Sequence, residues 1–349
     1  MSIRTFITMI LFCAVMVETD AQSVATDSIE NDTITSSEVK QSLPQKLDTK
    51  LTNKYFKTRY DTNYVVRPDQ KWLLRLLVNQ TGDHIHAKGT VRDVWSKYDL
   101  HTRQNTTFSL EVNYCDLAAS LSINPAKTHG DYNDYELNLE YHGNQFSIDA
   151  NYQRATSLAG DIKLGNIDHL DEEGLRMNVV NIASYYTFNH RRFSFPAALY
   201  QNYYQVRSAG SWLAGVSFQG GSIKTTRELQ ERSPETPVVH INFGHVGIGG
   251  GYGYNLVLGK RSQWLLHLSA LPTVVVYNYN KLTVNGMEIK AKHMRVNMIF
   301  NERAAVIYHF APRYFAGASL MMSNSLFDDK AVIINQNKWI ARAFLGVRL

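Results

Sequence analysis

Two histidines separated by a single residue, His84 and His86, could by type and spacing bind a transition-metal ion. In an extended segment their side chains project from the same face, and imidazole is a common ligand of zinc and copper. Asp83 precedes them, but the sequence identifies no third ligand. We therefore interpret this segment as a polar loop, and we predict neither a metal site nor a cofactor.

His267 and Ser269 have the same spacing and could belong to a hydrolase site in which a histidine activates a serine. Residues i and i+2 of a strand lie about 6–7 Å apart, which is too far for direct proton transfer between them. No G-x-S-x-G motif surrounds the serine. The sequence therefore predicts that both side chains fill the interior, and it predicts no catalytic residue.

Glycine occupies every second position from Gly247 to Gly253. The spacing does not fit the G-x-G-x-x-G fingerprint, and no Lys-Ser or Lys-Thr pair follows, so a phosphate-binding loop is excluded. We predict instead a strand whose inner face bends or accepts a bulky neighbour.

The composition limits the class of protein. The 349 residues are 44% hydrophobic and 19% charged, and their net charge of +5 includes no basic block, which argues against nucleic-acid binding. The two cysteines, Cys13 and Cys115, exclude a disulfide framework and a zinc ribbon. Past residue 21 no apolar run reaches the roughly 18 residues of a transmembrane helix.

The N-terminal residues 1–21 have the order of a cleavable signal peptide. Arg4 comes first, an apolar stretch from Phe6 to Val17 follows, and Ala21 precedes the expected cleavage site. Residues 22–60 begin with a stretch rich in Ser, Thr, Asp, Glu and Asn, which cannot bury enough apolar surface to fold. We predict a flexible periplasmic arm there.

The rest of the chain, residues 61–349, is dominated by alternation of apolar and polar residues. Four consecutive segments alternate strictly, and each therefore predicts a half-buried β-strand: 106–114, 117–123, 135–141 and 146–152. Less regular segments with the same period continue to the C-terminus.

Short and long links alternate between the predicted strands. The short links are 115–116, 143–144, 189–192, 259–261 and 311–313. The long polar links are near 81–103, 124–133, 156–176, 220–240, 278–292 and 324–335. This asymmetry is typical of outer-membrane barrels, which have short periplasmic turns and longer extracellular loops. It predicts about 12 strands (10–14) if 193–207 is an elaborated periplasmic link or a short inserted helix.

Three features favour a membrane barrel over a soluble sandwich. The last strand runs to the final residue, aromatic residues stand at strand ends, and the face opposite the apolar one is ionised. We therefore predict that residues 61–349 form an all-β, antiparallel up-and-down transmembrane β-barrel of the cell outer membrane. The residues expected to face lipid include Leu110, Leu121, Leu139 and Ile148, and those expected to face the lumen include Glu111, Glu136, Glu140 and Asp149.

Several arginines are predicted near the periplasmic rim or in the lower lumen: Arg191, Arg192, Arg207, Arg342 and Arg348. They could form a basic ring that selects anions, or they could pair with the acidic side chains of the inner face. Because charges of both signs are abundant on that face, we favour pairing.

Four stretches resemble a known family: NHRRFSFPAALYQ (189–201), QVRSAGSW (205–212), YGYNLVL (252–258) and WLLHLSALP (264–272). Together they resemble an uncharacterised family of Gram-negative outer-membrane proteins, catalogued as a domain of unknown function. The resemblance extends over nearly the whole chain after the arm. It implies an outer-membrane β-barrel, and it implies no activity and no catalytic residue.

The sequence thus predicts a non-catalytic barrel that acts as a narrow conduit, binds a solute or contributes to envelope structure. Two alternatives remain open: an outer-membrane enzyme acting on lipid or lipopolysaccharide, and a partner-binding module that uses its loops or the arm. The expected partners are outer-membrane lipid, the assembly machinery and a small solute. A lumen of about 12 strands crowded by charged side chains should pass small solutes at most.

Overall fold

The computed structural model describes residues 59–91, 94–114, 117–125, 134–164, 167–234, 236–290, 297–328 and 332–349. These residues belong to one unit, Asp48–Leu349. The predicted signal peptide (1–21) and all of the predicted arm (22–60) except Arg59 and Tyr60 lie outside the described residues. No helix of the described residues is long and apolar enough to cross a membrane.

The described chain is all-β, with two short helices, α4 (Phe195–Leu199) and α5 (Arg227–Arg232). The strands are β1 (Val65–Val66), β2 (Trp72–Val91), β3 (Val94–His101), β4 (Asn105–Tyr114), β5 (Leu117–Ile123), β6 (Tyr135–His142), β7 (Phe146–Ala155), β8 (Ala159–Leu164), β9 (Ile167–Leu170), β10 (Leu175–Thr187), β11 (Tyr204–Gln205), β12 (Ala209–Thr225), β13 (Val239–Leu258), β14 (Trp264–Val284), β15 (Met287–Lys290), β16 (Met298–His309), β17 (Tyr314–Asp328) and β18 (Val332–Arg348).

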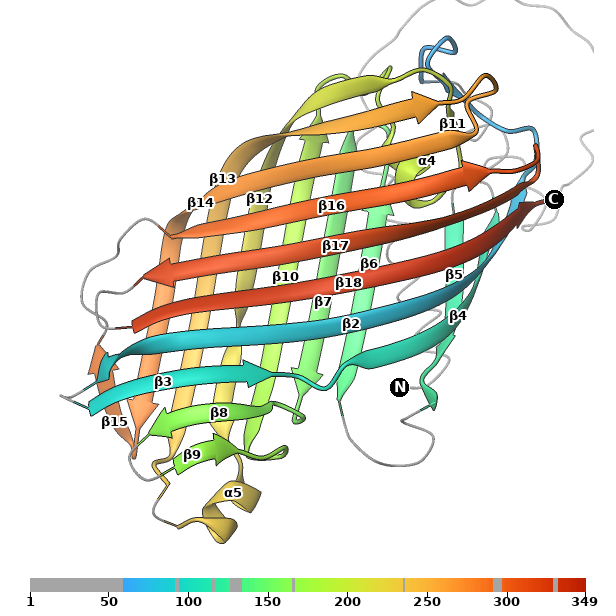
Figure 1. The fold of residues 1–349 in the computed structure, drawn as a ribbon. Coiled ribbons are helices and arrows are strands. Elements are labelled where there is room, and N and C mark those ends of the chain that lie inside the picture. The colour runs from blue at the N-terminus through green and yellow to red at the C-terminus, as the bar shows by residue number, and fades with distance from the viewer. Residues whose placement is uncertain are drawn as a thin grey trace, which may run out of the picture. The chain divides into compact units, whose positions relative to one another are not determined.

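One antiparallel sheet contains nearly all of these strands and curls into a barrel wall (Figure 1). Its order is β6-β7-β10-β12-β13-β14-β16-β17-β18-β2, and β2 then pairs with β4 along one half and with β3 along the other. β5 follows β4, and β8 and β9 follow β3. No pairing joins β5 to β6 among the described residues, so the predicted count of twelve strands stays a prediction.

The two ends of the barrel wall differ. At one end β2 begins and β18 ends, and Trp72 and Leu349 exchange backbone hydrogen bonds of 3.3 and 2.9 Å. We call this the terminus end; α4 lies beside it (Figure 1). At the opposite end, called the loop end, lie β8, β9, β15 and α5.

The faces predicted from the alternation are confirmed. The residues expected to face lipid point outwards, with exposed fractions of 46% for Leu110, 70% for Leu121, 41% for Leu139 and 44% for Ile148. The acidic residues point inwards, where Glu111 is 8% exposed and the side chain of Glu140 is 12% exposed. The apolar band is therefore on the outside of the barrel, as in a membrane-spanning sheet.

The long links predicted from polarity are largely strands, and that part of the prediction is wrong. β2 continues to Val91 and β3 begins at Val94, so 81–103 is mostly a hairpin. Likewise, β8 and β9 lie within 156–176, and β14 and β15 form a hairpin within 278–292. The alternation fades because the outer residues of these extensions are polar, while the backbone ladder continues.

The interior holds apolar clusters at both ends. The terminus-end cluster combines α4 with the inner faces of the strands around it, and its members include Leu73, Leu77, Tyr185, Phe193, Phe195, Leu213, Leu265, Ile307 and Phe315. The loop-end cluster comprises Ile85, Leu100, Ala155, Leu158, Ile162, Leu170, Met177 and Val179. Between these clusters the inner face is polar and charged.

Candidate functional site

The link between β10 and β12, residues 188–208, folds into the barrel at its terminus end. Ser194 caps α4, since its Oγ accepts a hydrogen bond of 3.2 Å from the Ala197 amide, and Pro196 occupies the first turn. All five helix residues are buried. A helix this short is unstable in isolation, so burial of its apolar residues stabilises it. The prediction of a short inserted helix in 193–207 is confirmed.

Aromatic rings of the link fill the interior. The Phe193 and Phe195 rings lie 4.9 Å apart, edge to face, and both contact the His267 ring, with centroid distances of 5.9 and 5.3 Å. A methyl group placed on Gly253 would lie 2.9 Å from the Phe193 ring. The glycine thus leaves room for the ring, which agrees with the bulky inner neighbour predicted for the glycine-rich strand.

Two arginines of the wall hold the C-terminal end of α4. Arg75 donates hydrogen bonds of 2.9 Å to the main-chain oxygen of Leu199 and 2.8 Å to Oε1 of Gln201, and it pairs with both carboxylate oxygens of Glu111. Arg348 donates 2.9 and 3.3 Å bonds to the main-chain oxygen of Gln201. These cations satisfy carbonyls that a helix end leaves without partners.

A chain of hydrogen bonds connects the link to β13 and β14. The Asn255 amide nitrogen donates to the main-chain oxygen of Ser194 at 2.9 Å and to Oε1 of Gln205 at 3.0 Å. Its oxygen therefore faces His267, whose Nδ1 lies 2.7 Å away. Because an amide oxygen only accepts, Nδ1 carries the proton, and the free electron pair of Nε2 faces the Ser269 hydroxyl at 3.0 Å.

This geometry corrects the expectation that His267 and Ser269 lie too far apart for direct proton transfer. The spacing argument applied to backbone positions, whereas the histidine side chain turns along the strand to reach the serine. Serine, histidine and an orienting amide in this order have the connectivity of a nucleophilic triad. However, His267 and Ser269 are each 3% exposed, and the phenylalanine rings of the link cover the histidine.

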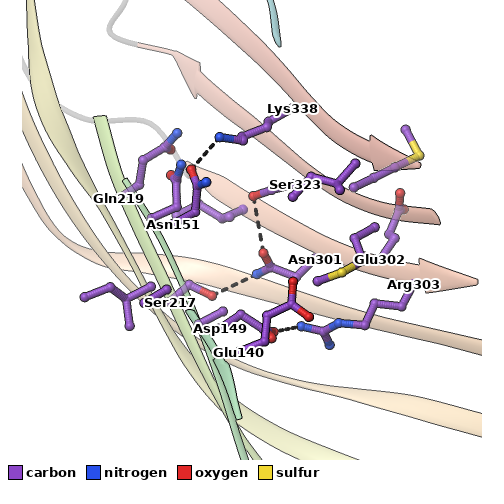
Figure 2. A pocket seen from close by; sticks show the side chains of 18 of the residues that line it. Glu140, Asp149, Asn151, Ser217, Gln219, Asn301, Glu302, Arg303, Ser323 and Lys338 are labelled. Atoms are coloured by element: carbon purple, nitrogen blue, oxygen red, sulfur yellow. Dashed lines mark hydrogen bonds and ion pairs between the residues drawn. The ribbon is translucent and has the colours of Figure 1, made fainter. Parts of the chain in front are cut away.

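A layer of ion pairs joins β6 and β7 to β16 and β18 across the lumen, and Figure 2 shows its Arg303–Asp149 pair. Arg342 binds both oxygens of Glu140, and Arg303 pairs with Asp149. The Lys338 ammonium lies 3.2 Å from Glu136. Four members of this layer, Glu140, Asp149, Arg303 and Lys338, line a cavity of about 80 Å³ together with amide and hydroxyl side chains such as Asn301 and Ser217 (Figure 2).

The favoured pairing of the arginines is confirmed for Arg342, whose partner is Glu140. Arg348 binds the link, and Arg192 lies 3.4 Å from Asp61. Arg342, Arg348 and Arg192 are therefore not part of the anion-selecting basic ring that was the alternative. Arg191 and Arg207 form no ion pair with a described acidic residue.

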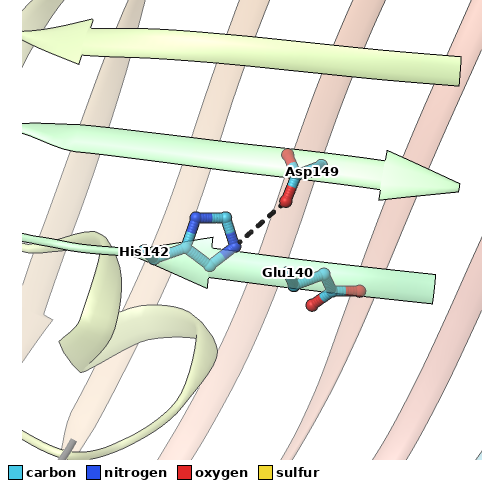
Figure 3. A group of neighbouring side chains, drawn as sticks. All are labelled: Glu140, His142 and Asp149. Carbon is cyan, nitrogen blue, oxygen red and sulfur yellow. Dashed lines mark ion pairs between the residues drawn. The ribbon is translucent and has the colours of Figure 1, made fainter. Parts of the chain in front are cut away.

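Glu140, His142 and Asp149 are the one group among the described residues whose ligand atoms, all within 4.8 Å of one another, could surround a metal ion (Figure 3). The His142 side chain is fully buried, and its Nε2 lies 3.3 Å from Asp149. Yet the two carboxylates are already balanced by Arg303 and Arg342. A divalent ion would add uncompensated charge to a buried layer, so these residues do not fit a metal.

The histidines singled out by their spacing do not belong to this layer. His84 and His86 are on the outer face of β2 near the loop end, in a strand and not in the predicted loop. Their contact with Asp99 of β3 was not foreseen from the sequence. The sequence also gives no sign of the contacts made by Asn255, Gln205, Arg75 and His142. At most, the alternation of apolar and polar residues indicates that these side chains face inwards.

Comparison with family models identifies a family and gives no activity. A family model described as a domain of unknown function, DUF4421, matches residues 59–349. No curated protein matches the chain.

The chain is similar to several solved structures of outer-membrane proteins, at low sequence identity. The outer membrane protease OmpT from Escherichia coli is 9% identical with a TM-score of 0.40, over 81% of this chain and 97% of that chain. The translocator domain of the autotransporter NalP from Neisseria meningitidis is 10% identical with a TM-score of 0.26, over 88% and 96%. The toluene transporter TodX from P. putida is 9% identical with a TM-score of 0.25, over 81% and 91%.

The family model covers the whole of the described chain, and the membership of an uncharacterised family expected from the sequence is confirmed. The chain belongs to the family of the domain of unknown function DUF4421.

Proposed function

We propose that this protein is a non-conducting β-barrel of the outer membrane that acts as a structural element of the envelope. The observation that carries this proposal is the 188–208 link, which places α4 inside the barrel and buries all five of its residues. Paired charges and the loop-end cluster occupy the lumen beyond it. Channel function requires a continuous wet path, and these side chains oppose one.

Conductance in planar lipid bilayers tests the proposal. The wild-type protein should give no steady current. A variant in which residues 190–206 are replaced by a short Gly-Asn turn, like the one that joins β6 to β7, should give a measurable current because α4 is removed. A migration shift between unboiled and boiled samples establishes that each variant has folded. A porin-like conductance of the wild type would contradict the proposal.

Location in the outer membrane is part of the same proposal, supported by the outward apolar band and its aromatic residues. Cell fractionation tests it directly. The protein should sediment with outer-membrane markers and resist extraction by carbonate. Recovery in the soluble periplasmic fraction would overturn it.

A lipid-directed hydrolase is the second candidate, because Ser269, His267 and Asn255 have the connectivity of a triad. His267 and Ser269 are buried, and Phe193 and Phe195 cover the histidine, so a structural role for these side chains in holding the 188–208 link is favoured. A fluorophosphonate probe, which labels activated serines, distinguishes the two. We expect no labelling of Ser269 in the wild type. Labelling that disappears in His267→Ala, with folding unchanged, would establish the enzyme instead.

A further inference from the structure

Four exposed cations lie on the connections at the terminus end of the barrel (Figure 1). They are Arg207 of the link between β10 and β12, Lys260 and Arg261 of the turn between β13 and β14, and Arg313 of the turn between β16 and β17. We call them the terminus-end cations. None of the four forms an ion pair with an acidic residue of the described chain, so this part of the protein does not balance their charge.

Hydrogen bonds hold both turns against the 188–208 link. The Ser262 hydroxyl donates a bond of 2.9 Å to the main-chain oxygen of Val206, which precedes Arg207. The hydroxyl of Tyr204, in the same link, donates to the main-chain oxygen of Pro312. Ser262, Val206 and Pro312 are each next in the chain to a terminus-end cation. The four cations therefore belong to one connected surface.

Exposed aromatic rings stand beside these cations. Trp264 begins β14 directly after its turn, and its ring centroid lies 4.4 Å from that of Tyr308 at the end of β16. Phe310 and Tyr314 lie on either side of Arg313, and their rings stack with centroids 6.0 Å apart. All four rings are more than a third exposed. Because exposed rings at strand ends mark the depth of the lipid head groups, the terminus-end cations lie at or next to the head-group layer.

We propose that the terminus-end cations bind the phosphate groups of anionic phospholipids in the periplasmic leaflet of the outer membrane. The proposal rests on the outer-membrane location proposed above, in which short turns face the periplasm. Guanidinium groups bind phosphate oxygens through two parallel hydrogen bonds, and clustered cations beside a membrane attract anionic lipid. The long stems of arginine and lysine carry the charges from the turns to the head groups. An anionic polymer of the periplasm could pair with the same charges, but it does not account for the exposed rings beside them.

The surface has a defined selectivity. Phosphatidylglycerol has one net negative charge, whereas phosphatidylcholine is zwitterionic and carries an ammonium group that these cations repel. Each lysine or arginine close to a membrane surface raises the affinity for anionic lipid about fivefold. Exposed charges are screened by salt, so the preference for phosphatidylglycerol should decrease as the ionic strength rises.

Native mass spectrometry tests the proposal on the full-length protein in detergent micelles that contain phosphatidylglycerol and phosphatidylcholine with the same acyl chains. The measured quantity is the ratio of the two lipids that the protein retains. We expect the wild type to prefer phosphatidylglycerol. Arg207→Gln, Arg261→Gln and Arg313→Gln should each lower the preference about fivefold, and the triple variant should lower it about 100-fold.

The matched control removes three exposed cations at the loop end. Lys88, Lys97 and Lys163 lie directly opposite one another on the outer face of β2, β3 and β8. Lys88→Gln/Lys97→Gln/Lys163→Gln changes the net charge by the same amount and should leave the lipid ratio unchanged. Heat-shifted migration verifies that both triple variants are folded.

Two further measurements separate the possible sources of the anion. Inorganic phosphate at the same concentration should not displace phosphatidylglycerol; displacement would mean that the surface binds free phosphate. Purified peptidoglycan should not sediment the wild type more strongly than the arginine triple variant. If it did, and no lipid preference were found, the partner would be the cell-wall polymer, and the lipid proposal would be overturned.

Two other results would contradict the proposal. One is a wild type that retains both lipids equally, and the other is a preference that the arginine triple variant keeps in full. The lipid ratio is measured without reference to conductance or to cell fractionation. A barrel that conducts could still prefer phosphatidylglycerol, and a closed outer-membrane barrel could lack the preference, so failure of this proposal is distinguishable from failure of the proposed function.

Discussion

The guanidinium of Arg75, near the start of β2, donates a hydrogen bond of 2.9 Å to the main-chain oxygen of Leu199, the last residue of α4. The two residues are 124 positions apart in the chain. The same guanidinium holds Glu111 on β4, so one side chain connects the wall to the inserted helix. Closure of the terminus end thus depends on a buried ion pair as well as on apolar packing.

Arg75→Met should destabilise the folded barrel by about 3–5 kcal/mol, because it leaves the Glu111 carboxylate buried without its partner. Arg75→Met/Glu111→Leu should lose less than Arg75→Met alone, since no charge is then left unpaired. The measurement is urea unfolding of protein folded into liposomes. A double variant as unstable as the sum of both single variants would show that the pair is not coupled.

Gly253→Val should disturb the seating of the link, because even a methyl group at this position would lie 2.9 Å from the Phe193 ring. Overpacking of a buried site costs about 1–3 kcal/mol. The matched control is Gly250→Ala, where the nearest atom is 3.4 Å away. We expect single-channel current, or faster proteolysis within 188–208, in the first variant only. If the two variants behaved alike, the Phe193 ring would not contribute to closing the terminus end of the barrel.

Strand positions and their facing were predictable because a barrel wall obeys a period of two. Leu110 and Glu111 occupy the outer and inner faces as the alternation requires. The alternation is lost where the outer residues of a strand lie beyond the apolar band and are polar. For this reason the sequence predicts loops at β3 and β8, which are strands. Polarity alone cannot distinguish a loop from a strand whose outer residues are polar.

The contacts of the interior were less accessible from the sequence. Parity places Asn255 and His267 inside, but their hydrogen bond depends on the register of β13 with β14. The contacts of Gln205 and Arg75 depend on how the link folds back into the barrel. Side-chain reach also matters, since the His267 ring meets Ser269 although their backbones are two positions apart.

Asn255→Asp should loosen the link, because a carboxylate cannot donate to the main-chain oxygen of Ser194 or to Gln205. Two buried acceptors would then face an anion, at a cost of at least about 2 kcal/mol in the free energy of unfolding. Ser269→Ala should lower the free energy of unfolding by less. The serine is the last member of this chain of hydrogen bonds, and its bond is to His267 and not to a residue of the link. Urea midpoints compare the two variants. The opposite order would mean that the serine, and not the amide, holds the link.

Leu268→Arg tests whether the outer face is in contact with lipid. Leu268 is 67% exposed on β14, between the outward-facing Trp264 and Tyr277, which stand where an interfacial girdle is expected. Near the bilayer midplane an outward arginine costs about 2–4 kcal/mol, so folding into liposomes should be impaired by that amount. Leu268→Ala, at the same position, measures the loss of apolar surface without the charge and should cost much less. If the arginine were tolerated as well as the alanine, this face would be in water, and the membrane-spanning orientation of the sheet would be wrong.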